Sequence, residues 1–167
     1  MPIAAAMLPE FDYEMAATRR ILALVPDAQA DWRPHQKSFT LGEIARHLAN
    51  MALWGTMTIR HDEMDLASPE ASRSMPFAGT DALLAEFDRA ATDFRGALAG
   101  TSDERMMAGW TLRHGSHQIF TLPRVGVLRT SVINHMIHHR GQLTVYLRML
   151  DVPLPDLYGP TADTKQG

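Results

Sequence analysis

Apolar residues recur at steps of three and four in four separate stretches of the chain, and this spacing is typical of amphipathic α-helices. The stretches predict helices over residues of about 8–25, 41–62, 81–99 and 123–150. Each helix carries one narrow apolar stripe, and its remaining sides are mostly polar or charged. Helices of this kind bury their stripes against one another. The pattern therefore predicts an all-α fold, a four-helix bundle.

The ends of the predicted helices coincide with residues that favour helix termini. Pro26 cannot continue the first helix. Thr40 followed by Glu43 is the capping-box pattern that opens the second helix. Pro123 fits the first turn of the last helix. These signals support the boundaries independently of the apolar stripes.

The segments between the helices show no helical period. Residues 64–80 are rich in serine, proline and glycine and predict a loop, whereas residues 101–122 predict an extended loop or a short hairpin. The tail, about 152–167, is expected to be non-helical because two prolines follow the last helix. Since no repeat or linker divides the chain, we expect a single domain over residues 1–167.

Charge and composition narrow the classes of function. The chain has a net charge of −3 and no run of lysine or arginine, which argues against nucleic-acid binding. No apolar stretch approaches the ~20 residues that cross a membrane, and the first residues lack the features of a signal peptide. Cysteine is absent as well. We therefore expect a cytoplasmic protein, in which any metal site must be built from His, Asp, Glu and water.

Three of the eight histidines fall on or near the predicted apolar stripes. His135 and His139 lie four residues apart on the last helix, so their imidazoles can reach a single point. His47 faces inward, or nearly so, on the second helix. Three imidazoles could bind one divalent ion and leave a fourth position open for water or substrate, as in catalytic metal sites. Such ligands suit zinc, nickel, iron or copper.

The alternative is that these side chains are hydrogen-bonded core histidines without a chemical role. For any single inward histidine that is the commoner outcome. A pair at metal-ligand spacing, with a third histidine on another helix, favours the metal site, provided that the two helices meet there.

Several neighbouring residues are candidates for supporting roles. Asn50 and Gln142 could orient an imidazole N–H through a hydrogen bond, and Trp54 could belong to the core or to a pocket wall. His138 is expected at the edge of the apolar face or in an interface, and Arg140 off the helix seam in a structural ion pair.

Two further features concern packing and the long loop. Gly141 lies inside a helix, where glycine costs about 1 kcal/mol relative to alanine, so we expect it to allow close helix packing. His114 and His117 lie in the segment that could fold over the mouth of the bundle. His35 and His61 are expected to be ordinary loop or helix-end residues.

Other chemistries fit the sequence poorly. Ferritin-like di-iron bundles use Glu-x-x-His motifs, whereas Glu43 and His47 are four residues apart. The chain has no cysteine nucleophile, no Gly-x-Ser-x-Gly elbow and no phosphate-binding glycine loop.

The last helix resembles the last core helix of the DinB family of four-helix-bundle metalloproteins. The resemblance lies in Asn134-His135-(x3)-His139-Arg140-Gly141-Gln142-Leu143. The tail Pro153-(x4)-Tyr158-Gly159-Pro160 is similar to the tail that often follows this helix. Upstream, Trp32-Arg33-Pro34-His35 and Leu41-Gly42-Glu43-(x3)-His47 are similar to the region that begins the family's second helix.

This resemblance implies that His47, His135 and His139 are the metal ligands, the same three that helical spacing selects. It also implies an up-down-down-up bundle, a zinc or nickel ion and a homodimer. Characterised members are transferases and isomerases that use a low-molecular-weight thiol, which the metal activates as thiolate. Residues 62–122 match no subgroup pattern, so the resemblance does not indicate the substrate.

The sequence therefore favours a metal-dependent enzyme of the DinB type, a thiol-dependent S-transferase or a related activity on a small molecule. One alternative is a metal-dependent hydrolase in which metal-bound water attacks the substrate. The other is a non-catalytic, stress-related protein that binds a metal or a small molecule.

Overall fold

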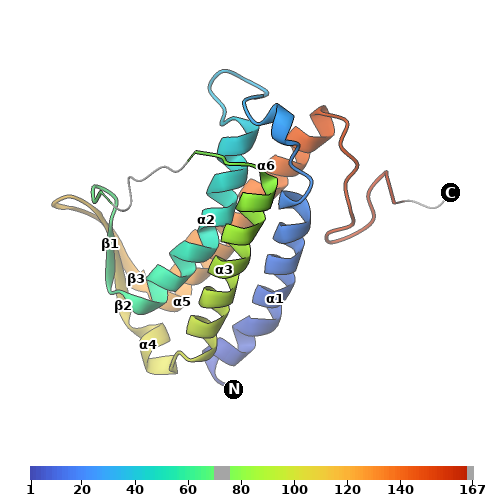
Figure 1. Ribbon diagram of the computed structural model, residues 1–167. Helices are drawn as coiled ribbons and strands as arrows, with labels where there is room; N and C mark the ends of the chain where they lie inside the picture. Colours follow the sequence, from blue (N-terminus) through green and yellow to red (C-terminus); the bar gives the residue numbers. More distant parts are fainter. Residues whose placement is uncertain (70–75, 165–167) are drawn as a thin grey trace.

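Long helices make up most of the structure, a computed structural model that describes residues 1–69 and 76–164 (Figure 1). They are α1 (Ile3–Leu22), α2 (Leu41–Arg60), α3 (Thr80–Ala99) and a last stretch formed by α5 (Arg124–Val127), η2 (Leu128–Asn134) and α6 (His135–Met149). Two short helices, η1 (Asp27–Gln29) and α4 (Asp103–Met107), lie in the connections. Helix α2 packs against α3 and α6, and α1 packs against the same two helices.

Each predicted helical stretch is present, with small differences at the ends. The first helix begins earlier than predicted, at Ile3, and ends at Leu22. The capping box that opens α2 is formed: Thr40 Oγ1 accepts a hydrogen bond from the Glu43 amide at 3.1 Å, and Glu43 Oε2 accepts one from the Thr40 amide at 2.7 Å. Among the described helices none is long and apolar enough to cross a membrane.

A small sheet corrects the prediction of an all-α chain. It has the order β1-β2-β3 and is formed by β1 (Glu63–Asp65), β2 (Gly109–His114) and β3 (His117–Pro123). Strand β1 is parallel to β2, and β2 and β3 form an antiparallel hairpin. A short hairpin is one of the two alternatives predicted for residues 101–122. Residues 70–75 of the predicted 64–80 loop lie outside the described residues.

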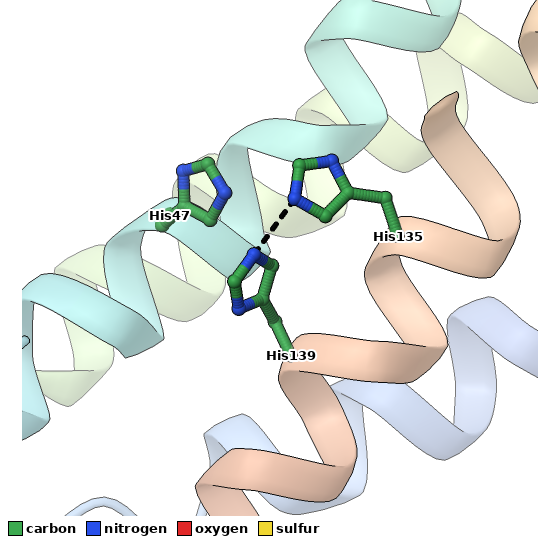
Figure 2. Close-up of side chains that lie close together, drawn as sticks. All are labelled: His47, His135 and His139. Atoms are coloured by element: carbon green, nitrogen blue, oxygen red, sulfur yellow. Dashed lines mark hydrogen bonds between the residues drawn. The ribbon is translucent and has the colours of Figure 1, made fainter. Parts of the chain in front are cut away.

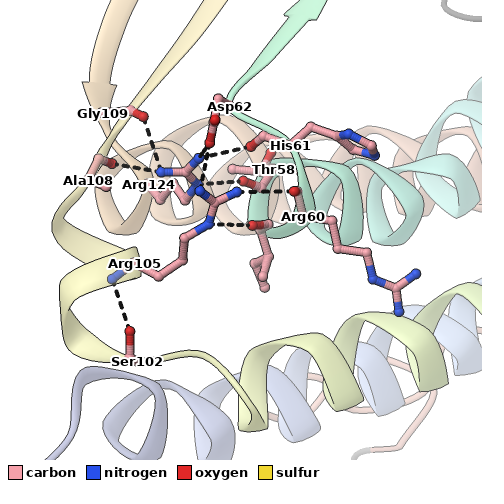
Figure 3. A network of polar contacts seen from close by, with 10 residues as sticks. Thr58, Arg60, His61, Asp62, Ser102, Arg105, Ala108, Gly109 and Arg124 are labelled. Atoms are coloured by element: carbon pink, nitrogen blue, oxygen red, sulfur yellow. Dashed lines mark hydrogen bonds and ion pairs between the residues drawn. The ribbon is translucent and has the colours of Figure 1, made fainter.

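The sheet lies to one side of the long helices (Figure 1) and is joined to them by two arginines (Figure 3). Arg124 is fully buried and donates to the carbonyls of Thr58 at 3.1 Å and His61 at 3.0 Å. Arg105 donates to the Arg60 carbonyl at 3.1 Å, and both guanidinium groups contact Asp62. The last carbonyls of a helix have no partner within the helix. The two cations therefore satisfy and stabilise the C-terminal end of α2.

The last helical stretch is not a regular α-helix. Segment η2, Leu128–Asn134, has π-helical hydrogen bonding and leads directly into His135. Leu128, Val132, Met136 and Arg140 are at most 1% exposed and lie four residues apart, and Ile133, Leu143 and Leu147 are buried beside them. A step of four suits the wider turn of a π-helix. The sequence predicts an inward face through His135, His139 and Gln142, but the buried face of α6 is centred one residue further along the chain, and Gln142 is exposed.

Two glycines inside helices have opposite surroundings. A Cβ on Gly55 would lie 2.2 Å from Cε1 of Phe94, a fully buried ring that meets the Phe11 ring edge-on at a centroid distance of 4.8 Å. Gly55 therefore permits the close packing of α2 on α3. A Cβ on Gly141 would meet no atom within 4 Å, and the residue is exposed. The prediction that Gly141 allows close helix packing is thus wrong.

We expect Gly55→Ala to destabilise the fold by about 1–3 kcal/mol, because the added methyl overpacks a fixed aromatic contact. The matched change Gly141→Ala should be neutral or stabilising by up to about 1 kcal/mol, since alanine favours the helix and nothing opposes it. Urea unfolding of both variants beside the wild type measures the difference. Equal stabilities for the two variants would contradict this account of the α2–α3 contact.

Candidate metal centre

His47 of α2 and His135 and His139 of α6 meet between the two helices (Figure 2). One ring nitrogen from each lies within 4.8 Å of the other two. The ring centroids are 4.5 Å apart for His47 and His139, 4.6 Å for His135 and His139, and 5.2 Å for His47 and His135. The structure therefore brings together the three imidazoles that the sequence singles out.

The local structure explains this convergence. His135 and His139 are one turn apart on α6, so their side chains leave the helix on the same side. His47 lies in the second turn of α2, whose first turn is fixed by the capping box at Thr40. Because α2 packs against α6, the third imidazole faces the pair.

Hydrogen bonds set the proton positions on His139. Its Nδ1 lies 2.7 Å from Gln142 Oε1, which is an acceptor, so Nδ1 carries the proton. The lone pair of His139 Nε2 then points at His135 Nε2, also 2.7 Å away. Gln142 thus makes the orienting contact that the sequence suggested for it.

The donor set fits a divalent ion. Nitrogens bound at ~2.1 Å to a tetrahedral zinc ion lie roughly 3.4 Å apart, which is wider than the 2.7 Å between the two Nε2 atoms and narrower than the 4.8 Å limit of the group. Small rotations of the rings would bring all three donors to ligand distance. A cation between them would replace the proton that His135 and His139 share.

Burial lowers the pKa of two of the three imidazoles, His47 and His139. The pKa of His47 is lowered from 6.5 to about 4, first by desolvation and then by the neighbouring charges of His139 and His135. The pKa of His139 is also lowered, mainly by burial, although its hydrogen bond to Gln142 opposes the shift. Within the described chain no carboxylate contributes to either shift. Neutral imidazoles are the form that binds a metal, since no proton has to be displaced.

Phe39 is a neighbour of this site that the sequence analysis did not select. Its ring centroid lies 5.8 Å from that of His47 and 6.4 Å from that of His139, and 48% of the residue is exposed. The only signal in the sequence was its position directly before Thr40, the residue that caps α2.

The other candidates take different positions. His138 is exposed, and its ring centroid is 5.0 Å from that of His139, at the edge of the site. Trp54 is partly buried against the apolar core. Asn50 is partly buried one turn beyond His47. Gln142 is therefore the supporting residue for which the described contacts give a direct hydrogen bond.

The remaining histidines do not join the group. His114 and His117 are exposed and pair across the end of the β2–β3 hairpin. His35 is exposed, and its Nδ1 accepts a hydrogen bond from the Lys37 amide at 3.1 Å. His61 is the C-cap residue of α2.

Arg140, directly after His139, forms the expected ion pair but is buried rather than off the seam. Its Nη2 lies 2.6 Å from Glu14 Oε2, and its Nη1 donates to Thr18 Oγ1 at 3.2 Å. The hydroxyl of Tyr158 accepts from Arg140 at 2.5 Å and donates to Glu14 Oε1 at 2.8 Å. The buried pair of Arg140 and Glu14 ties α6 to α1, and the exposed Tyr158 joins the C-terminal tail to it.

Comparisons with known proteins place the chain among relatives of one kind. Residues 10–143 match the family model of the DinB superfamily. The chain is 27% identical over 157 residues to YrdA of Bacillus subtilis (strain 168), an uncharacterized protein, and the match covers 93% of this chain and 88% of YrdA.

Two solved structures have a similar fold. A DinB-like protein from Bacillus cereus aligns with a TM-score of 0.71 at 22% identity, covering 94% of this chain and 98% of that one. The DinB-like protein YjoA from Bacillus subtilis aligns with a TM-score of 0.66 at 16% identity, covering 89% and 96%. At these identities the two structures show a similarity of fold alone.

Acid should destabilise the metal-free protein between about pH 6.5 and about pH 4. In this window an unfolded imidazole binds a proton, whereas His47, with a pKa of about 4, stays neutral in the folded state. The unfolded state then holds more protons, so the free energy of unfolding falls as the pH falls. Urea unfolding of the metal-free protein at several pH values measures this slope. His47→Gln should show a shallower slope, and an unchanged slope would contradict the assignment.

Proposed function

The chain belongs to the DinB superfamily, and on that premise we propose that it is a metal-dependent enzyme of the DinB type. One divalent ion, zinc or nickel, is held by His47, His135 and His139. The observation that carries the proposal is the convergence of three imidazoles from two helices, a group that no fourth His, Asp or Glu of the described residues joins. That arrangement supports an open coordination position, which is the mark of catalytic rather than structural sites.

Within this proposal the activity is a thiol-dependent transfer to a small molecule. When bound, the ion supplies a positive charge that lowers the pKa of a thiol and favours the thiolate. The sulfur forms a bond to an electrophilic atom of the second substrate, the leaving group departs with its electron pair, and the thiol proton passes to solvent. His139, held by Gln142, keeps its Nε2 lone pair directed into the site.

The electrostatics of the site support thiol transfer over hydrolysis. Metal-dependent hydrolases commonly use a carboxylate as general base. The carboxylate one turn before His47 is that of Glu43, and its Oε2 is engaged by the Thr40 amide at 2.7 Å. A nucleophile that is ionised at the metal needs no such base. The hydrolase and the non-catalytic binding protein are therefore outcomes that the experiments below distinguish.

The proposal includes a cytoplasmic homodimer with an up-down-down-up helix order and no nucleic-acid or membrane partner. Its support is the family membership, the composition and the absence of basic runs in the sequence.

The metal-free protein should bind one equivalent of Zn²⁺ or Ni²⁺. His47→Ala, His135→Ala and His139→Ala should each weaken binding by more than about 100-fold, beyond the effect of losing a supporting contact. The control is His138→Ala, an exposed neighbour of His139 that should keep its affinity. Titration against a competing chelator measures the constants. Unchanged metal affinity in the His139 variant would overturn the ligand assignment.

Chelator should also lower the Tm of the wild type and of His138→Ala, because a ligand of the native state stabilises it by mass action. The His139→Ala protein should lose this sensitivity. A shift of equal size in that variant would mean that the ion binds elsewhere.

The second experiment tests the thiol. Cobalt-substituted protein should develop a sulfur-to-metal charge-transfer band when 2-mercaptoethanol is added, and His139→Ala should not. Consumption of an aryl halide should then depend on both metal and thiol. Metal-dependent cleavage of an ester without thiol would instead favour the hydrolase. Absence of both the band and any turnover would favour the binding protein.

A further inference from the structure

Phe39 is unusual among the phenylalanines of this chain. All six lie in the described part of the structure, and Phe11, Phe87 and Phe94 are at most 1% exposed. Phe77 and Phe120 are partly buried, whereas Phe39 is 48% exposed. Exposure alone is ordinary for a single apolar side chain, so what sets Phe39 apart is that its exposed ring lies next to the imidazoles.

The ring is nevertheless held in a defined place. Phe39 directly precedes Thr40, whose backbone and side chain are both fixed by the capping box. The amide of Leu41 donates to the Trp32 carbonyl at 2.8 Å, which closes the loop behind Phe39. The Trp32 ring in turn packs edge-on against Tyr146 of α6 at a centroid distance of 5.8 Å. The loop is therefore anchored to both helices that carry the imidazoles.

The position of the ring relates it to two of the three imidazoles. It is inclined at 37° to the His47 ring and at 54° to the His139 ring, at centroid distances of 5.8 Å and 6.4 Å. One face or edge of Phe39 contacts the site, and about half of the residue remains open to solvent. A molecule that reaches the imidazoles from solvent on this side passes along the ring.

The charge of a bound metal ion also determines which donor atom the site favours. Histidine binds a metal through an uncharged imidazole, so three histidine ligands leave the full charge of a divalent ion uncompensated and the position beside it favours an anionic donor atom. The Phe39 ring, beside His47 and His139, gives the site an apolar border. The site thus combines a preference for an anion at one point with a preference for an apolar group a few ångströms away.

We propose that Phe39 is a specificity-determining residue of this site. Its ring forms an apolar wall that selects ligands whose anionic donor, such as a thiolate, is attached to an aromatic or bulky alkyl group. This inference rests on the proposed function in requiring a metal at the three histidines, and it extends that function by stating the class of ligand.

The test compares ligands that share a donor but differ in the group attached to it. Cobalt-substituted protein is titrated with phenylmethanethiol and with 2-mercaptoethanol, and binding is followed by the absorption of the metal. The wild type should prefer phenylmethanethiol. Phe39→Ala should weaken the binding of phenylmethanethiol by about 5–30-fold, the range expected for losing one aromatic contact. The affinity for 2-mercaptoethanol should change by no more than about two-fold.

Three controls isolate the ring. Phe39→Tyr keeps an aromatic wall and should retain the preference. Ile119→Ala removes another exposed apolar side chain, 46% exposed on β3, and should change neither affinity. The cobalt affinity of every variant is measured first against a chelator and should equal that of the wild type, because Phe39 is not a ligand.

A parallel titration with phenylacetate and acetate needs no thiol chemistry, so it separates the two proposals. Selection of phenylacetate by wild type but not by Phe39→Ala supports the wall even if neither thiol binds, in which case the thiol function fails alone. If the wild type shows no aromatic preference in either pair, the inference is overturned. The inference is also overturned if Phe39→Ala keeps the aromatic preference, or if it weakens the binding of both ligands of a pair by the same factor.

Discussion

The close approach of three imidazole rings is the constraint on which the rest of this structure depends. Each neutral ring offers one donor and one acceptor, and two Nε2 atoms at 2.7 Å can share only one proton. His47 faces this pair with a ring nitrogen within 4.8 Å of both, and burial lowers its pKa to about 4. A divalent cation satisfies all three lone pairs at once, which hydrogen bonds among the three rings cannot do. The fold therefore has to hold the three rings close enough for one cation to contact all of them.

The two helices that carry the rings are fixed by charged and capping contacts at several points. Helix α2 is held at its start by Thr40 and Glu43 and at its end by Arg105 and Arg124. Helix α6 is tied to α1 through the buried pair of Arg140 and Glu14. Such a pair contributes little net stability against a well-packed apolar alternative, but it fixes the register of α6 one residue after His139. Rigid elements of this kind are what a metal site needs.

The sequence predicted the features that depend on local signals and missed those that depend on distant contacts. Helical stripes, the capping box at Thr40 and the spacing of His135 and His139 are all properties of residues within one or two turns. The burial of Arg140, by contrast, depends on Glu14, which is 126 residues away in the chain. The role of Phe39 depends on how its loop closes over α2 and α6. Strand β1 pairs with β2 across more than forty residues, so its three positions carried no pattern that could be seen locally.

The π-helical segment η2 explains why His135 and His139 lie at the margin of the core and not at its centre. A regular α-helix from Leu128 onward would have carried the apolar stripe through His135 and His139, as their spacing suggests. The wider turns of η2 move the buried face to Met136, Arg140 and Leu143 instead. His139 is then only 8% exposed and His135 partly buried, while His138 and Gln142 reach solvent. A site one residue off the core axis is buried enough to lower the pKa values of His47 and His139 and open enough for a small molecule to approach. Turns of this type are frequent at functional sites, and here the irregular segment ends at Asn134, directly before His135.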